Sequence, residues 1–194
     1  MKTINKSIIT HLIQLALFIS GPIAVADDIR EKVISSEAVQ LPSPVIVPDE
    51  SLFGVPYGTT EDEFITKVGP PTGYIRLSKD ESALLYGKAH LFIFTNDALS
   101  GVYVHPSLFR WRASNRISMF TAFDRFQWKL DNGIGEGTNL REVKEVIENY
   151  HSERPYAMSF TTENALVDLN FVHAVSMGDG DEAYSLAGLY IRLK

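Results

Sequence analysis

Hydrophobic and polar residues follow a helical period and then a strand-like alternation, and this order of patterns occurs twice along the chain. The first helical pattern lies near residues 60–68 and the second over roughly 139–150. Each is followed by short runs rich in aromatic and β-branched residues, which are typical of strands. The runs that predict strands are 84–86, 91–95, 99–104, 156–161, 166–172 and 187–193, with 123–130 as a further candidate.

Residues at the ends of the helical patterns indicate where the helices begin and end. Thr60 followed by Glu63, and Asn139 followed by Glu142, are capping boxes, in which each side chain accepts a hydrogen bond from the other residue's backbone amide. Gly69-Pro70-Pro71 ends the first helix, because proline cannot continue it. The local signals therefore predict two short helices, each placed before a set of strands.

Two pairs of segments are similar to each other in sequence. Residues 55–64 share Gly, Thr, Glu and apolar positions with 134–143, and 99–104 (LSGVYV) matches 186–191 (LAGLYI). Such self-similarity predicts a duplicated architecture. We expect an α+β protein made of two tandem helix-plus-antiparallel-sheet repeats that form one body. Repeat unit 1 is expected at 51–104, an inter-repeat linker at 105–122 and repeat unit 2 at 123–194.

The N-terminus has the pattern of a secretory signal peptide. Lys2 and Lys6 form a basic start, an almost uncharged stretch follows, and Ala24-Val25-Ala26 places small residues before a cut. A membrane-spanning anchor is the alternative, but polar residues dilute the stretch and Pro22 interrupts it. We expect cleavage after Ala26, which leaves no membrane anchor.

A proline-rich lead occupies 27–50 in this interpretation. Its segment Leu41-Pro42-Ser43-Pro44-Val45-Ile46-Val47-Pro48 is too rich in proline for a helix and favours an extended path. Two interpretations remain open for this segment. It is either a linker or an edge segment strapped onto the folded body.

Composition narrows the classes of function. The 194-residue chain has no cysteine, which excludes disulfides, thiolate metal sites and a catalytic cysteine. Its formal charge of −6 argues against a nucleic-acid partner. Export without any cysteine points to a bacterial periplasm, because small eukaryotic secreted domains usually rely on disulfides.

The first repeat resembles a known family. Its residues 58–64, 68–73 and 92–102 are similar to the helix and meander of the SmpA/OmlA family of small bacterial envelope proteins. A tandem of two such units resembles the β-lactamase-inhibitor-protein-like fold. The chain departs from the first family in lacking the cysteine that carries its lipid, and from the second in lacking disulfides. The resemblance implies a fold and a place in the envelope, and it transfers no binding residue.

No catalytic or metal-binding motif occurs in the sequence. His90, His105, His151 and His173 show no ligand spacing, and no nucleophile motif occurs. The acidic loop 178–182 lacks the spacing of a calcium loop and is typical of a polar hairpin tip. We therefore expect no catalytic residue, no metal and no cofactor.

Three places are candidate partner-binding surfaces. The linker concentrates arginine and aromatic residues, which are enriched at interface hot spots, although they are also consistent with a crossover that caps the core. The second candidate is a pair of tyrosines at matching positions of the repeats, and the third is the acidic loop. The candidate residues are Phe109, Arg110, Trp111, Arg112, Tyr103, Tyr190, Asp179 and Asp181.

Together these observations favour an exported, periplasmic, non-enzymatic protein that binds another envelope protein in an assembly or inhibitor-like role. The alternative is a periplasmic enzyme, or a protein that binds a small ligand or metal through its histidine, arginine and acidic residues.

Overall fold

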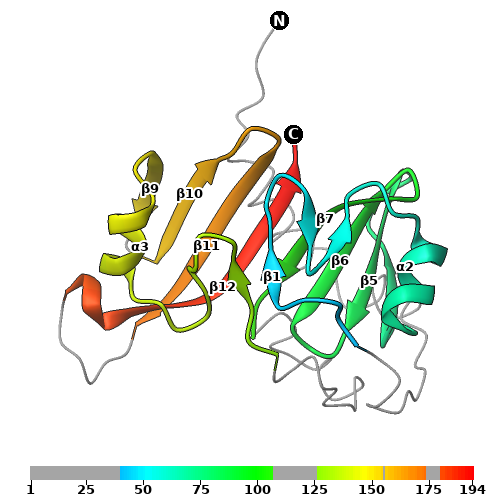
Figure 1. Ribbon diagram of the computed structural model, residues 1–194, viewed down its shortest axis with the longest axis horizontal. Helices are drawn as coiled ribbons and strands as arrows, with labels where there is room; N and C mark the ends of the chain where they lie inside the picture. Colours follow the sequence, from blue (N-terminus) through cyan, green and yellow to red (C-terminus); the bar gives the residue numbers. More distant parts are fainter. Residues whose placement is uncertain (1–39, 107–125, 155, 174–179) are drawn as a thin grey trace, which may run out of the picture.

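One antiparallel sheet of eight strands forms the body of the protein in the computed structural model (Figure 1). The structure describes residues 40–106, 126–154, 156–173 and 180–194. The expected signal peptide and most of the expected linker lie outside these residues. The strands, in their order across the sheet, are β4 (Gly73–Arg76), β5 (Glu81–Tyr86), β6 (His90–Thr95), β7 (Ala98–Val104), β12 (Tyr184–Leu193), β11 (Ala165–His173), β10 (Ala157–Thr161) and β9 (Tyr150–Arg154).

The predicted fold class, α+β with two tandem helix-plus-antiparallel-sheet repeats, is wrong. The described part of the chain is mostly strand and holds two α-helices, α2 (Glu61–Val68) and α3 (Leu140–Val146). Its main sheet is continuous, because β7 pairs directly with β12. Helical periodicity over 139–150 also overstated the second helix. Ile147 has extended backbone angles, and the chain then enters β9 at Tyr150.

Both predicted helix starts are confirmed. Thr60 and Glu63 form a reciprocal capping box at α2, and Asn139 and Glu142 form another at α3. The first helix ends at Gly69, as the following prolines predicted. Each helix places its apolar residues on the sheet, so the helices cover part of one face only (Figure 1).

The six main predicted strands are present, with bounds that differ by a few residues. Asn96 and Asp97 have positive φ angles of 52° and 65° and join the paired residues Thr95 and Ala98, which confirms the hairpin turn. Strands β4 and β9 were not predicted. The candidate strand at 123–130 is reduced to β8 (Lys129–Leu130) within the described residues.

Part of the proline-rich lead lies against the body. Strand β1 (Val45–Ile46) pairs in parallel with β8, and a short hairpin of β2 (Ser51–Leu52) and β3 (Val55–Pro56) follows. Asp49 then accepts hydrogen bonds from Thr162 Oγ1 at 2.5 Å and from the Asn164 backbone at 2.7 Å. Burial alone would raise the pKa of Asp49, but these hydrogen bonds hold it below its usual value. Residues 41–49 are therefore a strap rather than a free linker.

The core lies between one face of the sheet and the layer formed by α2, α3 and the strap. Its centre is aromatic, with Phe64 against Phe92 at 4.6 Å between ring centroids and against Phe94 at 5.5 Å. Aliphatic residues from both ends of the sheet belong to the same cluster. In the described part of the chain, no helix has the length and apolar character needed to cross a membrane.

Two glycines allow β7 and β12 to pair. A Cβ on Gly101 would lie 2.5 Å from the Ile191 carbonyl oxygen, and one on Gly188 would lie 2.6 Å from the Val104 oxygen. Real Cβ atoms do not approach backbone oxygens this closely. The glycine shared by the matching segments 99–104 and 186–191 is therefore required by close approach at this pairing.

Gly101→Ala should lower the free energy of unfolding by about 2 kcal/mol, because the methyl group must displace the β12 backbone. Urea denaturation measures the change. Gly180→Ala is the matched control, since nothing lies within 4 Å of its Cβ position and its φ is −144°. An equal, small effect of both substitutions would contradict a tight contact between β7 and β12.

The buried histidine of β6 couples stability to pH. His90 is 2% exposed and lies 5.8 Å from the Phe53 ring. Burial lowers the pKa of His90 to about 4, because the charged imidazolium is poorly solvated in the core. The unfolded chain, whose histidine titrates near 6.5, therefore binds a proton that the folded chain does not bind between pH 6.5 and 4.

Acidification from pH 7 to pH 4 should remove roughly 3 kcal/mol of stability through His90. Above pH 7, His90 should contribute no change of stability with pH, because it is neutral in both the folded and the unfolded chain. Urea denaturation across this pH range measures the slope. His90→Leu should reduce the slope without abolishing it, because Asp49, whose pKa is lowered in the folded chain, also loses stability on acidification. His173→Gln, at an exposed position, is the matched control. A wild-type slope in His90→Leu would assign the pH dependence to other groups.

Candidate functional site

A row of polar and aromatic side chains crosses the sheet face that lies opposite the helices. Cross-strand partners in the register are His151 with Ser159, Ser159 with Asp168, Asp168 with Tyr190, and Tyr190 with Tyr103. Directly opposed residues share a face of the sheet. Val167 and Leu169, which flank Asp168 along its strand, belong to the core, so Asp168 faces away from it. We call these five residues the polar row.

Specific contacts join the members of the polar row. The Ser159 hydroxyl donates a hydrogen bond to Asp168 Oδ1. The Tyr103 and Tyr190 rings meet edge to face, with centroids 6.1 Å apart and an interplanar angle of 73°. His105 stacks on Tyr103 at 6.0 Å and 12°. The row therefore has an aromatic end on β7 and β12 and a hydrogen-bonding end on β9 to β11.

The second carboxylate oxygen of Asp168 has no hydrogen-bond partner in the described structure, although it is buried. Burial raises the pKa of the Asp168 carboxyl, and the hydrogen bond from Ser159 opposes part of that rise. The neighbouring Tyr190 is 8% exposed, and burial likewise raises its pKa, with Arg192 opposing the change. The centre of the row thus holds an acceptor whose loss of hydration is not fully compensated.

The nearest arginine of β12 is engaged elsewhere on the same face. Arg192 donates to Glu81 Oε1 at 2.6 Å, and the two side chains are 34% and 25% exposed. This ion pair reaches from β12 to β5 across the two strands between them. Gly101 lies directly opposite Arg192 in the register and has no side chain to obstruct it.

A shallow, open depression of about 440 Å³ lies at the outer end of the row. It includes the row members His151 and Ser159, so the row and the depression form one surface. Its lining residues are Glu148, Asn149, Tyr150, His151, Ser159, Phe160, Thr161 and Leu166.

The order of groups in the row suits binding better than nucleophilic catalysis. In a serine triad the histidine stands between the serine and the acid and accepts the serine proton. Here Ser159 stands between His151 and Asp168 in the register, and its hydroxyl donates to the carboxylate. Within the described ranges, no three acidic or histidine side chains gather in a way that could hold a metal ion.

The structure describes three of the eight candidate binding residues predicted from the sequence. It brings Tyr103 and Tyr190 together at the aromatic end of the row. Asp181 lies in the short 3-10 helix η5 (Asp181–Ala183), where its carboxylate forms an ion pair with Lys144 of α3. The remaining candidates, Phe109, Arg110, Trp111, Arg112 and Asp179, lie outside the described residues.

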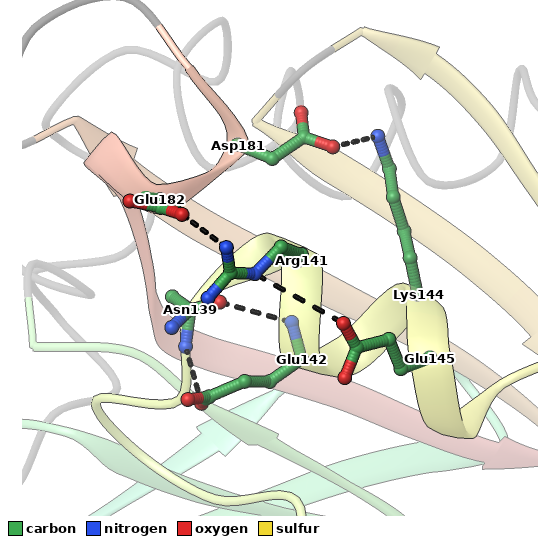
Figure 2. A network of polar contacts seen from close by, with 7 residues as sticks. All are labelled: Asn139, Arg141, Glu142, Lys144, Glu145, Asp181 and Glu182. Atoms are coloured by element: carbon green, nitrogen blue, oxygen red, sulfur yellow. Dashed lines mark hydrogen bonds and ion pairs between the residues drawn. The ribbon is translucent and has the colours of Figure 1, made fainter.

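Figure 2 shows the ion pairs that hold η5 against α3. Lys144 Nζ lies 2.6 Å from Asp181 Oδ2, and Arg141 bonds Glu182 while also approaching Glu145 at 4.0 Å. The α3 capping box of Asn139 and Glu142 lies beside these pairs. Asp181 therefore has an internal role in holding η5, which leads into β12, against α3.

Sequence reasoning missed Ser159 and Asp168. Alternation along 165–171 does indicate that Asp168 and Asn170 face away from the core. The alternation does not show which residues of other strands lie beside them, because that depends on register between strands distant along the chain. The sequence therefore indicates on which face of the sheet Asp168 lies, but it does not indicate which residues of other strands lie beside it.

Lys144→Ala and Asp181→Ala should each destabilise the protein slightly, and their effects should be non-additive, with a coupling below about 1 kcal/mol that falls as salt is added. Urea denaturation of the single and double variants measures the coupling. Lys67→Ala, on the distant helix α2, is the control and should add independently to Asp181→Ala. Full additivity of Lys144→Ala and Asp181→Ala would contradict the internal role of Asp181.

Comparisons with known proteins add no family to this geometry. The sequence matches no protein-family model, and no curated protein and no solved structure shows significant similarity to it.

Proposed function

We propose that the protein is an exported, non-enzymatic binding protein that recognises another protein of the bacterial envelope through the sheet face bearing the polar row. The observation that carries the proposal is the row itself, with two tyrosines, a serine and an incompletely hydrogen-bonded aspartate aligned across neighbouring strands. Tyrosines next to a few polar groups are typical of the centre of protein interfaces.

The extent of the row favours a macromolecular partner. Its five residues stand on five neighbouring strands, which at about 4.8 Å per strand spacing span roughly 19 Å. The adjoining depression is open rather than enclosed, whereas small-molecule sites usually bury most of their ligand. An open surface of this extent suits contact with another protein surface.

The compartment is proposed from the N-terminal sequence pattern, and it agrees with the absence of cysteine. The formal charge of −6 becomes more negative if the expected cleavage removes Lys2 and Lys6. The acidic chain suits a partner with a basic surface, because complementary charges speed association and reject acidic competitors.

One observation supports a second candidate, a small-ligand site in the depression. Glu148, Tyr150 and His151 line it and could contact a small polar molecule. The depression has an open, partly polar surface and does not include Asp168, so it accounts for less of the face than the protein-binding proposal does.

Site-specific photocrosslinking tests the proposal. A benzophenone amino acid at Asn170, on the row face of β11, should form an adduct with one envelope protein in cells, and the same probe at Lys67 on α2 should not. Tyr103→Ser should reduce the Asn170 adduct at least tenfold at a temperature well below the melting temperature of the variant, which is measured in parallel because Tyr103 packs against the apolar cluster of this face.

An adduct that forms equally from Asn170 and Lys67, or that survives Tyr103→Ser unchanged, would contradict recognition through this face. Saturable binding of a small envelope metabolite with no protein adduct would favour the depression instead.

A further inference from the structure

We infer that Asp168 is the receptor for a basic side chain, lysine or arginine, presented by the partner protein. This inference rests on the proposed function and names the chemistry of its central contact. The site consists of the Asp168 carboxylate, the Ser159 hydroxyl that orients it, and the Tyr190 and Tyr103 rings that follow it in the row.

The carboxylate needs a partner that the described chain does not supply. A carboxylate accepts several hydrogen bonds, and here Ser159 provides one, to Oδ1. The other oxygen, Oδ2, is buried and accepts none in the described structure. A buried carboxylate oxygen without a donor is unfavourable. Because the Asp168 side chain is partly exposed, it can turn toward an incoming cation, and a charge-assisted hydrogen bond then relieves this cost.

The cationic group of β12 does not fill this role. Arg192 is held by Glu81 at 2.6 Å, on the far side of β7 and β6, and it also interacts with the Tyr190 hydroxyl. The ion pair with Glu81 leaves that arginine neutralised. The described residues therefore supply no cation to Asp168, and Glu148 in the neighbouring depression adds a second carboxylate nearby.

The groups around Asp168 suit a cation on a flexible stem. Tyr190 precedes Tyr103 in the row, and their edge-to-face packing offers aromatic surface against which a basic side chain can lie. On the opposite side, Glu148 in the depression adds negative potential near Ser159 and Leu166. An acidic partner residue would meet two carboxylates here, so charge selects a basic segment.

A matched pair of peptides tests the inference on the purified full chain. Acetyl-Ala-Arg-Ala-amide should shift the backbone amide NMR signals of residues near 159, 168 and 190 saturably at millimolar concentration. Acetyl-Ala-citrulline-Ala-amide has nearly the same shape but no charge, and it should bind at least tenfold more weakly. Asp168→Asn should abolish the difference between the two peptides, whereas Asp62→Asn, on α2, should preserve it.

Three results would overturn the inference: equal binding of both peptides, unchanged preference in Asp168→Asn, or shifts confined to a different surface. A fourth is a change in the Asp168 signals when Arg110 and Arg112 are replaced by alanine without added peptide, since the chain's own segment would then be the occupant. The Asn170 crosslink is scored separately. If it persists in Asp168→Asn, the face still binds a partner and only the basic-residue contact is rejected.

Discussion

The pairing of β7 with β12 is the contact on which the rest of the structure depends. It joins the strands before residue 105 to those after 126 in one sheet, so that one core extends beneath both. The approach is so close that Gly101 and Gly188 have no room for a side chain. The same pairing places Tyr103 beside Tyr190. Without it, the aromatic and hydrogen-bonding ends of the polar row would belong to different sheets.

The two ends of the sheet use the face opposite the helices differently. On β4 to β6 this face carries a small apolar cluster that includes Ile75, Leu85 and Leu91, all largely buried. On β9 to β12 it carries the polar row, where Ser159 and Asp168 are only partly buried. The change of character occurs at β7, where Tyr103 packs against the apolar cluster and also contacts Tyr190. The face therefore combines a structural region with a region suited to recognition.

How far the sequence predicts this structure depends on how local each feature is. The capping boxes at Thr60 and Asn139 and the turn at Asn96 depend on neighbouring residues and were predicted correctly. The fold class was not, because similarity between 99–104 and 186–191 suggested separate units, whereas the two segments pair with each other. The row through Asp168 was missed for the same reason. Register between distant strands leaves no local pattern.

The partners of the acidic side chains differ in a way that supports the proposed binding role of the face. Asp49 is held by Thr162 and Asn164, and Glu81 is matched by Arg192. Each of these carboxylates links segments far apart in the chain, so its partner contributes to folding. Asp168 instead receives one hydrogen bond from the adjacent strand and keeps a buried oxygen without a donor. Such a group costs stability in the free protein, and a cation bound there would recover that cost, so the proposed recognition would draw on a cost already present in the fold.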